Sequence, residues 1–325
     1  MNQFLHINLI VSHSIQSGEL FLCFIFLYFC TLGMEPSEKY LFKHKGSYFV
    51  QSLATPEYID SLRDFEIRDS DVFIISYPKS GTMWTQHILS MIYHEGHRNG
   101  TESMDLLDRA PWLEYKVRDI DYVNRPSPRL FTTHMRSQFV PKGLSNGRTK
   151  IIYVMRNPKD VLVSYYHYSK VSVQLEEIGD FDMFMERFLA GKMLGDLWLD
   201  HIEDWYAQKD NFNILFLVYE DMKKDLRSAI LKICNFLGKS LNEEQVDDIM
   251  AKASFDKMRA DPRTNAENLP SDVLDHSKGR FLRKGTIGDW KNTMTVAQSE
   301  RFDSVFKERM EKLPFKFCWD INDEL

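Results

Sequence analysis

The residues best suited to bind a ligand lie at 76–84, in the sequence SYPKSGTMW. An apolar run at 72–76 leads into them and a helical pattern follows, so they form a predicted turn between a strand and a helix. Free backbone N–H groups and the positive end of the helix dipole gather at such a turn, which suits it to an anion. Lys79 adds a positive charge, Ser80 a hydroxyl donor, and Gly81 lets the backbone approach a phosphate closely. We therefore expect an anion-binding turn, with a plain strand–turn–helix connection as the alternative.

This turn differs from a Walker A loop because its lysine precedes its single glycine, so ordinary nucleoside triphosphate hydrolysis is not indicated. Two further basic groups occur downstream. Arg156 follows an apolar run at 150–155, and Ser164 lies on the helix that Pro158 begins. Residues 278–291 hold five basic residues and one acid in an otherwise acidic chain. A charge cluster alone usually marks a solvated surface, but the three groups together favour a ligand that carries phosphates at two places.

Four short apolar runs and six helical patterns must position these residues. The runs at 72–76, 129–133, 150–155 and 213–218 are almost entirely apolar, as in strands buried on both faces of a parallel sheet. Helical patterns alternate with them at 82–95, 158–169, 181–189, 196–208, 222–237 and 295–312. The alternation predicts an α/β fold with a central parallel sheet flanked by helices, whose ligands lie beyond the carboxyl ends of the strands. The long stretch at 261–289 is predicted to be a functional loop.

The composition excludes several classes of protein. The 325 residues carry 41 Lys and Arg against 47 Asp and Glu, and a net charge of −6 argues against a nucleic-acid binder held by a basic surface. Hydrophobic residues make up 43% and charged residues 27%, as in soluble globular proteins. Four cysteines are too few for a disulfide framework, and the sequence shows no cluster of metal-ligating residues. We therefore expect a reducing, cytoplasmic setting and no metal.

Residues 1–33 differ from the rest of the chain and contain no Lys or Arg. Their apolar run at 20–32 spans 13 residues, fewer than the roughly 20 that a spanning helix needs. A secretory signal would need a basic start, which this segment lacks. We expect Met34 to be an alternative initiator, the segment before it to be optional or an artefact of gene prediction, and residues 34–325 to form one domain. The competing hypothesis is a short hydrophobic anchor on a lumenal enzyme, which the glycosylation sequon at 99–101 would suit.

Taken together, these motifs resemble the cytosolic sulfotransferases over residues 40–322. The matching segments are YPKSGTMW at 77–84, RNPKDVLVSYYHY at 156–168, YEDM at 219–222 and RKGTIGDWK at 283–291. The segments GHRNGTE, DRAPWLEY and FCWDINDE are most similar to the amine sulfotransferase branch. The resemblance implies the P-loop-kinase-like sulfotransferase fold and 3′-phosphoadenosine 5′-phosphosulfate (PAPS) as the sulfuryl donor. It also implies transfer to an amine or a hydroxyl of a small apolar acceptor, in xenobiotic metabolism and without a metal.

The resemblance also assigns donor-binding roles to residues of this chain. The 5′-phosphosulfate would be held by Lys79, Ser80, Gly81, Thr82 and Met83. The 3′-phosphate would be held by Arg156, Ser164, Arg283, Lys284 and Gly285. The adenine would lie against Trp84, Tyr219, Ser254 and Phe255. A tryptophan in the first turn of a helix is otherwise more often part of the core, so its stacking role comes from the resemblance alone. Many relatives have Thr at the position of Ala253, which leaves one hydrogen bond on the adenine side open.

By the same resemblance, His134 is the catalytic base and Lys79 stabilises charge on the leaving oxygen. His134 directly follows the predicted strand at 129–133, at the edge of the sheet where ligands are expected, although a lone histidine is more often structural. A neutral imidazole can accept the acceptor's proton near pH 7, since its usual pKa is roughly 6.5. Relatives often have Lys at the position of Thr132, so Lys79 is expected to carry more of the charge stabilisation.

An apolar, aromatic acceptor pocket is expected as well. Pocket positions of relatives align with Tyr48, Phe49, Trp112, Tyr115 and Tyr168, each of which could equally be ordinary core. The spacing of Lys291, Thr295, Val296 and Glu300 is similar to the family's short dimerisation motif and predicts a homodimer.

The acceptor stays open between an amine, a phenol and a hydroxysteroid. Two other functions also stay open at this point. One is a catalytically weak relative that binds nucleotide or small ligands, which Thr132 and Ala253 would suit. The other is a membrane-anchored carbohydrate sulfotransferase, although such enzymes usually add a stem and lumenal disulfides.

Overall fold

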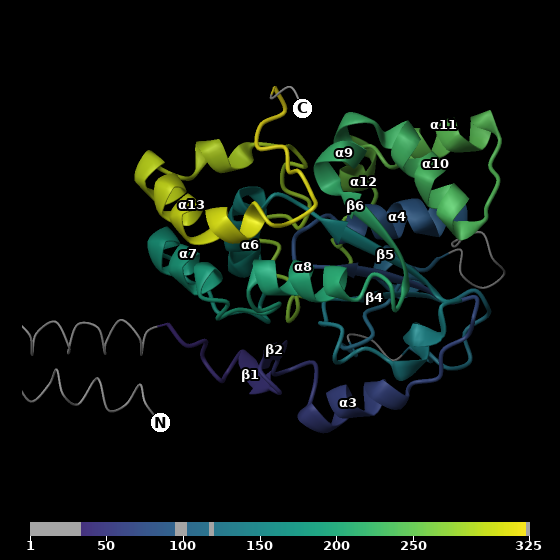
Figure 1. Ribbon diagram of the computed structural model, residues 1–325, viewed down its shortest axis with the longest axis horizontal. Coiled ribbons are helices and arrows are strands. Elements are labelled where there is room, and N and C mark those ends of the chain that lie inside the picture. Colours follow the sequence, from purple (N-terminus) through teal and green to yellow (C-terminus); the bar gives the residue numbers. More distant parts are fainter. Residues whose placement is uncertain (1–33, 95–102, 117–119, 323–325) are drawn as a thin grey trace, which may run out of the picture.

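A four-stranded parallel sheet forms the centre of the computed structural model, which describes residues 34–94, 103–116 and 120–322 (Figure 1). Its strands are β3 (Val72–Ser76), β4 (Leu130–Thr133), β5 (Lys150–Met155) and β6 (Asn213–Val218), in the order β4-β3-β5-β6. The register pairs Ile75 with Thr133 and with Tyr153. Because all four strands run in one direction, their carboxyl ends meet at one edge, where a ligand is expected.

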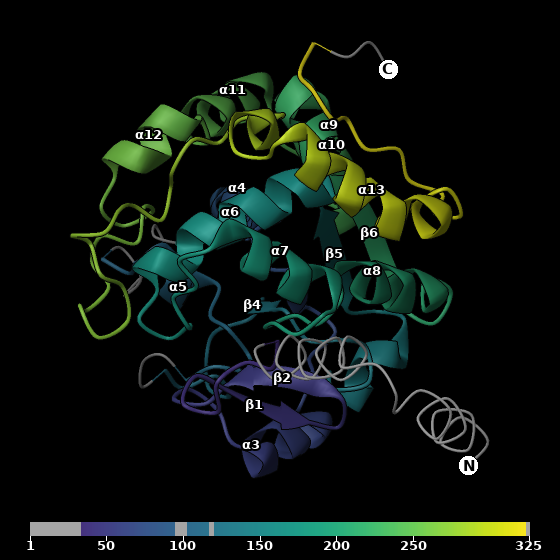
Figure 2. The same cartoon turned by 90° about the vertical axis from the view of Figure 1, so that its left-hand side faces the viewer.

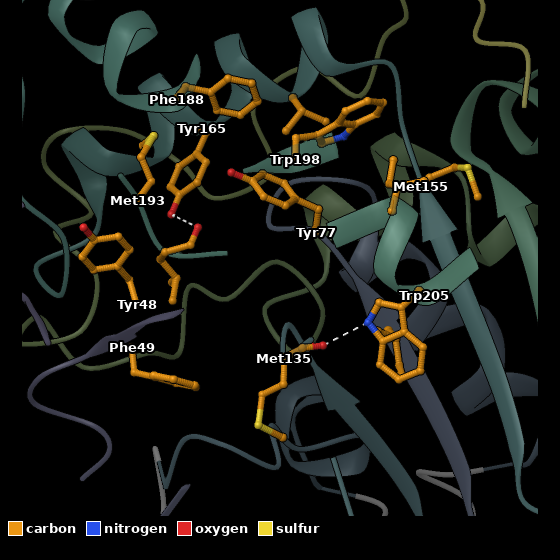
Figure 3. Packing of buried hydrophobic residues seen from close by; sticks show 14 of the residues in the cluster. Tyr48, Phe49, Tyr77, Met135, Met155, Tyr165, Phe188, Met193, Trp198 and Trp205 are labelled. Atoms are coloured by element: carbon orange, nitrogen blue, oxygen red, sulfur yellow. Dashed lines mark hydrogen bonds between the residues drawn. The ribbon is translucent and has the colours of Figure 1, made fainter. Parts of the chain in front are cut away.

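Helices cover both faces of this sheet, because successive side chains of each buried strand point to opposite sides. One face packs on α4 (Thr82–Ile92), α10 (Leu226–Leu237) and α11 (Glu243–Lys252). The other packs on α6 (Pro158–Val171), α7 (Phe181–Leu189), α8 (Trp198–Ala207) and α13 (Val296–Met310). Figure 3 shows part of this second core, in which Tyr77 lies among Tyr165, Phe188 and Trp198. The α/β fold with a central parallel sheet flanked by helices, which the sequence predicts, is therefore confirmed.

The remaining elements are short. They are β1 (Leu41–His44), β2 (Ser47–Val50), α3 (Pro56–Ser61), α5 (Leu106–Arg109), α9 (Tyr219–Lys224) and α12 (Phe255–Ala260), with 3-10 turns at Leu62–Asp64, Lys142–Asn146 and Asp289–Asn292. The hairpin β1–β2 and helix α3 lie together at the lower end of the molecule in Figure 2. None of the helices in the described part of the chain is long and apolar enough to cross a membrane.

The predicted strands at 72–76, 150–155 and 213–218 are confirmed, and the fourth begins one residue later than expected. The single helix predicted over 222–237 is wrong. Asp225 ends α9 with an extended φ of −139° and starts α10, where its side chain accepts a hydrogen bond from the Ser228 N–H (2.9 Å). The predictions for residues 1–33 and for the sequon at 99–101 fall outside the described residues.

The long stretch at 261–289 is tied to α6, which holds it over the carboxyl ends of the strands. Asp275 N–H donates to the Val171 carbonyl (2.8 Å), and Ser172 forms a bridge with Leu274. At its other end, the Asp160 carboxylate accepts from Gly288 N–H (2.8 Å) and from Trp290 N–H (3.0 Å). Contacts with α6 and the residue that follows it therefore hold this stretch in the middle and at its C-terminal end.

Candidate active site

A cavity of about 550 Å³ opens at the carboxyl ends of the strands. It receives one segment from the end of each strand: the turn after β3, His134 after β4, Arg156 after β5 and Tyr219 after β6. The loop at 281–286 closes it. Within the ranges that the structure describes, no three His, Cys, Asp or Glu side chains are grouped so that they could hold a metal ion.

The turn after β3 has the form of an anion cradle. Gly81 has a φ of +102°, and a Cβ at this position would lie 2.7 Å from the Tyr219 ring. The position therefore requires glycine, both for its left-handed backbone and for its close approach to Tyr219. The Ser80 hydroxyl is fully buried and has no hydrogen-bond partner within the described part of the chain. A buried hydroxyl without a hydrogen-bond partner is rare in native structures.

Lys79 lies where the cradle meets a pair of aromatic rings. Its Nζ is 4.0 Å from the centroid of the Tyr168 ring and 3.9 Å from that of the Phe281 ring. Burial, together with the positive charges of Arg156 and Arg283, lowers the pKa of Lys79 to about 7. An anion bound beside Lys79 would favour its charged form and reverse this shift.

The second basic group forms another cradle, around Arg156. Its guanidinium lies 4.4 Å from the Tyr219 ring centroid, and Nη2 donates to the Thr286 carbonyl (2.8 Å). Across the cavity, Asp289 is almost fully buried and holds both Arg283 (2.5 Å) and Lys284 (2.6 Å). The Nε atoms of Arg156 and Arg283 are buried without a hydrogen-bond partner in the described chain. Both arginines therefore retain donors that an anion could use.

Gly285 and the adenine-side residues complete this half of the cavity. Gly285 has a φ of +64°, and a Cβ there would lie 2.3 Å from the Phe255 ring. Trp84 is fixed by a hydrogen bond from Nε1 to the Ala253 carbonyl (2.9 Å), and its ring meets that of Tyr219 at 5.3 Å. The cavity brings together every residue that the resemblance assigned to the donor except Ser80, which is buried beneath its wall.

His134 presents one ring nitrogen to the cavity. Its Nδ1 lies 2.5 Å from the Ser76 carbonyl oxygen. Since a carbonyl can only accept, Nδ1 carries the proton and Nε2 has a free lone pair. Burial lowers the pKa of His134 to about 3, with smaller contributions from His201 and Lys79. The imidazole is therefore neutral at physiological pH and able to accept a proton at Nε2.

The family of this chain follows from comparison with known proteins. A family model described as "Sulfotransferase domain" matches residues 69–314, three quarters of the chain. The chain belongs to the sulfotransferase family. This confirms the resemblance read from the motifs.

Relatives and a solved structure agree with this assignment. The sulfotransferase is 56% identical over 293 residues to "Amine sulfotransferase" of Oryctolagus cuniculus, which covers 90% of this chain and 97% of the relative. It is 40% identical over 284 residues to "Sulfotransferase 2B1" of Mus musculus, with 87% and 84% covered. The crystal structure of mouse sulfotransferase SULT7A1 complexed with PAP is similar, with a TM-score of 0.67, 29% identity, and 84% and 96% of the two chains covered.

Thr132 has a structural role in this sulfotransferase. It is fully buried, donates from Oγ1 to the Ala110 carbonyl (2.9 Å), and accepts from Gln86 Nε2 (2.8 Å). Its side chain does not line the cavity. A lysine at position 132 could not keep the hydrogen bond that Thr132 accepts from Gln86. The buried hydrogen bonds below the site therefore suit threonine.

The acceptor half of the cavity is aromatic, but its residues are only partly those expected. Trp112, Tyr115 and Tyr168 line the cavity, and the Trp112 ring centroid is 4.3 Å from that of His134. Tyr48 and Phe49 do not line it, which corrects their assignment as pocket residues.

Both side chains belong to the large hydrophobic core cluster and extend in different directions from β2 (Figure 3). Tyr48 donates its hydroxyl to Glu35 (2.7 Å), and Phe49 packs edge-on against Phe139 at 5.2 Å. Both border a much smaller cavity next to His134.

Several lining residues were not predicted from the sequence, among them Tyr122, Tyr165, Leu194 and Phe281. Phe281 lies two residues before Arg283 and could have been found from that motif. Tyr122 carries no local signal, since it reaches the cavity from a loop. It donates its hydroxyl to the Trp112 carbonyl (2.9 Å), which fixes the position of that loop.

The residues of the expected dimerisation motif lie away from the cavity, around the start of α13. Lys291 pairs with Asp320. Thr295 caps α13 reciprocally with Gln298, so it has a local structural role. Val296 is 75% exposed, unusually high for a large apolar side chain, and Glu300 is exposed beside it.

Proposed function

We propose that this sulfotransferase moves the sulfuryl group of PAPS to the nitrogen of a small apolar amine, and that residues 34–325 carry the activity. The observation that carries the proposal is the position of the neutral His134 Nε2 in one cavity with two separate anion cradles. A hydroxyl acceptor, as in a phenol or a hydroxysteroid, is the alternative for the same machinery.

The residues present fit this donor. A nucleotide with phosphates on both sides of its ribose needs two anion sites, which the turn at Lys79 and the arginine pair of Arg156 and Arg283 supply. The unpartnered Nε atoms of both arginines are available as donors to it. Bound PAPS would supply an activated sulfuryl group on a good leaving group.

The chain's own groups account for proton transfer and charge stabilisation. His134 Nε2 accepts the proton of the acceptor N–H as the nitrogen–sulfur bond forms. Charged Lys79 stabilises the negative charge that builds on the oxygen whose bond to sulfur breaks. Burial keeps the pKa of His134 low, so the imidazolium then returns its proton readily to solvent. The aromatic rings of Trp112 and Phe281 exclude water from the reacting groups.

Two observations support an amine as the acceptor. The relative that is 56% identical is named amine sulfotransferase. In addition, Lys79 lines the cavity beside its aromatic rings, with Nζ 4.0 Å from the Tyr168 ring centroid. An amine must be neutral to attack, and the positive charge of Lys79 disfavours its protonation.

The proposal is tested by transfer of labelled sulfate from PAPS to 1-naphthylamine, 1-naphthol and a hydroxysteroid. 1-Naphthylamine and 1-naphthol share a ring system and differ only in the accepting atom. We expect transfer to the amine to be preferred. Transfer only to the phenol or the steroid would contradict the amine assignment. The His134→Ala variant is expected to bind 3′-phosphoadenosine 5′-phosphate (PAP) normally and to lose transfer, and full activity in it would overturn the assigned base. Donor binding without transfer to any acceptor would favour a ligand-binding relative.

We also propose a cytoplasmic homodimer that uses the surface around the exposed Val296. The motif at 291–300 supports this surface. Light scattering of Val296→Glu is expected to show a monomer with unchanged kcat, whereas a dimer in this variant would place the interface elsewhere. Fractionation of cells that express the full chain or a Met34-started chain tests the location.

A further inference from the structure

Three buried polar side chains around His134 have no part in the mechanism described above: Glu114, Tyr153 and His201. We propose that they are positioning residues that clamp the main chain of His134 and thereby aim Nε2 at the acceptor. The inference rests on the proposed role of His134 as the base. None of the three lines the cavity, so they act through His134 and not on the substrates.

Glu114 holds the N–H side of the His134 main chain. Its Oε1 accepts from His134 N–H at 2.7 Å, while its Oε2 is buried without a hydrogen-bond partner in the described chain. The side chain is 1% exposed, and burial raises its pKa to about 7. Burying a carboxyl group costs stability, and the hydrogen bond to His134 N–H is the contact through which this one reaches the site.

His201 and Tyr153 hold the C=O side. The Nε2 of His201 donates to the His134 carbonyl at 3.0 Å, and its Nδ1 lies 2.8 Å from the Tyr153 hydroxyl. Because the carbonyl only accepts, the proton is on Nε2, and Tyr153 must donate to the bare Nδ1. Burial lowers the pKa of His201 to about 4, so the ring stays neutral and the proton assignment is unique.

The clamp joins elements that are far apart in the sequence. Tyr153 is on β5, His201 is on α8, and Glu114 is in the segment after α5, which Leu113 ties to β4 through its N–H and the Thr132 carbonyl (2.9 Å). The next carbonyl, that of Met135, is held in turn by Nε1 of Trp205 at 3.1 Å (Figure 3).

With Ser76 on Nδ1, every polar atom of His134 except Nε2 thus has a fixed partner. A shift of a catalytic group by about 1 Å can lower the reaction rate on the order of a hundredfold. Fixing the position of His134 is therefore expected to raise kcat.

Removal of single groups tests the clamp. Tyr153→Phe deletes one hydroxyl and leaves Nδ1 of His201 without a hydrogen-bond donor, so the His201 ring is held less firmly. Its kcat is expected to fall about tenfold, while KM for PAPS and for the amine stays within about twofold. The matched control is Tyr166→Phe, which loses a similar hydrogen bond, to the Gly179 carbonyl (2.6 Å), outside the cavity wall. This control is expected to keep its kcat.

A conservative pair of variants separates the hydrogen bond from packing at Glu114. Glu114→Gln keeps an acceptor for His134 N–H, whereas Glu114→Ala removes it, so we expect Gln to retain most of the kcat and Ala to lose roughly ten- to a hundredfold. Nitrogen-15 NMR of the imidazoles adds a direct readout: His201 should be the neutral Nε2–H tautomer in both proteins, and its Nδ1 resonance should shift in Tyr153→Phe because Nδ1 loses its hydrogen-bond donor.

Failure of this inference is distinct from failure of the proposed function. Unchanged kcat in Tyr153→Phe, or equal losses in Glu114→Gln and Glu114→Ala, would overturn the clamp if His134→Ala is inactive. An active His134→Ala would overturn the proposed base itself. PAP binding measured by calorimetry checks that each variant is folded, and Tyr153→Phe decides alone if Glu114→Ala does not fold.

Discussion

The two halves of the cavity are built in different ways. The nucleotide half is polar and consists of short sequence motifs that follow β3 and β5, closed by the loop at 283–285. The acceptor half consists of rings such as Trp112 and Tyr115, which come from loops and helices spread along the chain. A charged ligand common to many enzymes requires fixed backbone geometry, whereas an apolar acceptor requires only shape and ring surface. The first half therefore leaves a sequence motif and the second leaves almost none.

Lys79 touches both halves, and its removal is expected to have the largest effect. Its Nζ lies over the Tyr168 and Phe281 rings while its charge faces the donor's cradle. Loss of one group that stabilises charge in the transition state typically costs about 10²–10³ in kcat, and we expect this of Lys79→Met.

Lys223→Met is the matched control, since Lys223 also lines the cavity but lies 5.9 Å from the Trp84 ring centroid, on the nucleotide side. Steady-state kinetics should show a much smaller change of kcat for it. Equal losses in the two variants would mean that only the overall charge matters.

The nucleotide half should be the less tolerant of added volume. Gly285→Ala places a Cβ against Phe255 at a φ of +64°, so we expect PAP affinity to fall by roughly a hundredfold, from clash and backbone strain together. Gly238→Ala provides the control for strain alone, because Gly238 has a similar φ of +68° and no atom within 4 Å of the added Cβ. Calorimetric titration with PAP should leave Gly238→Ala close to wild type. A normal affinity of Gly285→Ala would show that the loop relaxes freely.

The same contrast explains what could be predicted from the sequence. The core strands were found within one residue because they are short apolar runs, and Lys79, Gly81 and Arg156 were found because chemistry and spacing coincide there. The break at Asp225 was missed because the helical pattern continues across it.

Tyr48 and Glu114 show that the contacts of a single side chain are hard to predict from the sequence. Tyr48 was assigned to the pocket by resemblance, yet its ring is buried outside the cavity and its hydroxyl donates to Glu35. Glu114 was not predicted, because its contact with His134 spans 20 residues and depends on how two loops pack. Periodicity and motifs carry no information about such tertiary contacts.

A pair of tryptophans offers a test that separates the two halves. Trp112 lines the cavity beside His134, and Trp84 lies against Tyr219 on the nucleotide side. Loss of one large aromatic contact is worth on the order of 1–2 kcal/mol, so Trp112→Leu should raise the KM of the amine roughly tenfold and leave PAP affinity unchanged. Trp84→Leu should show the reverse pattern in the same two measurements. If each variant weakened both ligands, the halves would not be independent.

The smallest expected effect concerns pH and the nucleotide half. With a pKa of about 7, Lys79 is largely neutral at pH 8 in the free enzyme, and a bound anion restores its charge. PAP binding should therefore take up a proton and weaken as pH rises, by about fivefold between pH 7 and 8. His134, with a pKa of about 3, stays neutral over this range and does not contribute.

Calorimetry in buffers of different ionisation enthalpy measures this uptake, which should approach one proton at pH 8. Lys79→Arg keeps its charge at all these pH values, because a guanidinium does not deprotonate in proteins, and should show neither the uptake nor the change in affinity. If the uptake persisted in Lys79→Arg, the proton would bind at another group, and Lys79 would already be charged in the free enzyme. The aromatic pair of Tyr168 and Phe281 would then act as a cation site that stabilises Lys79 rather than as part of an apolar wall.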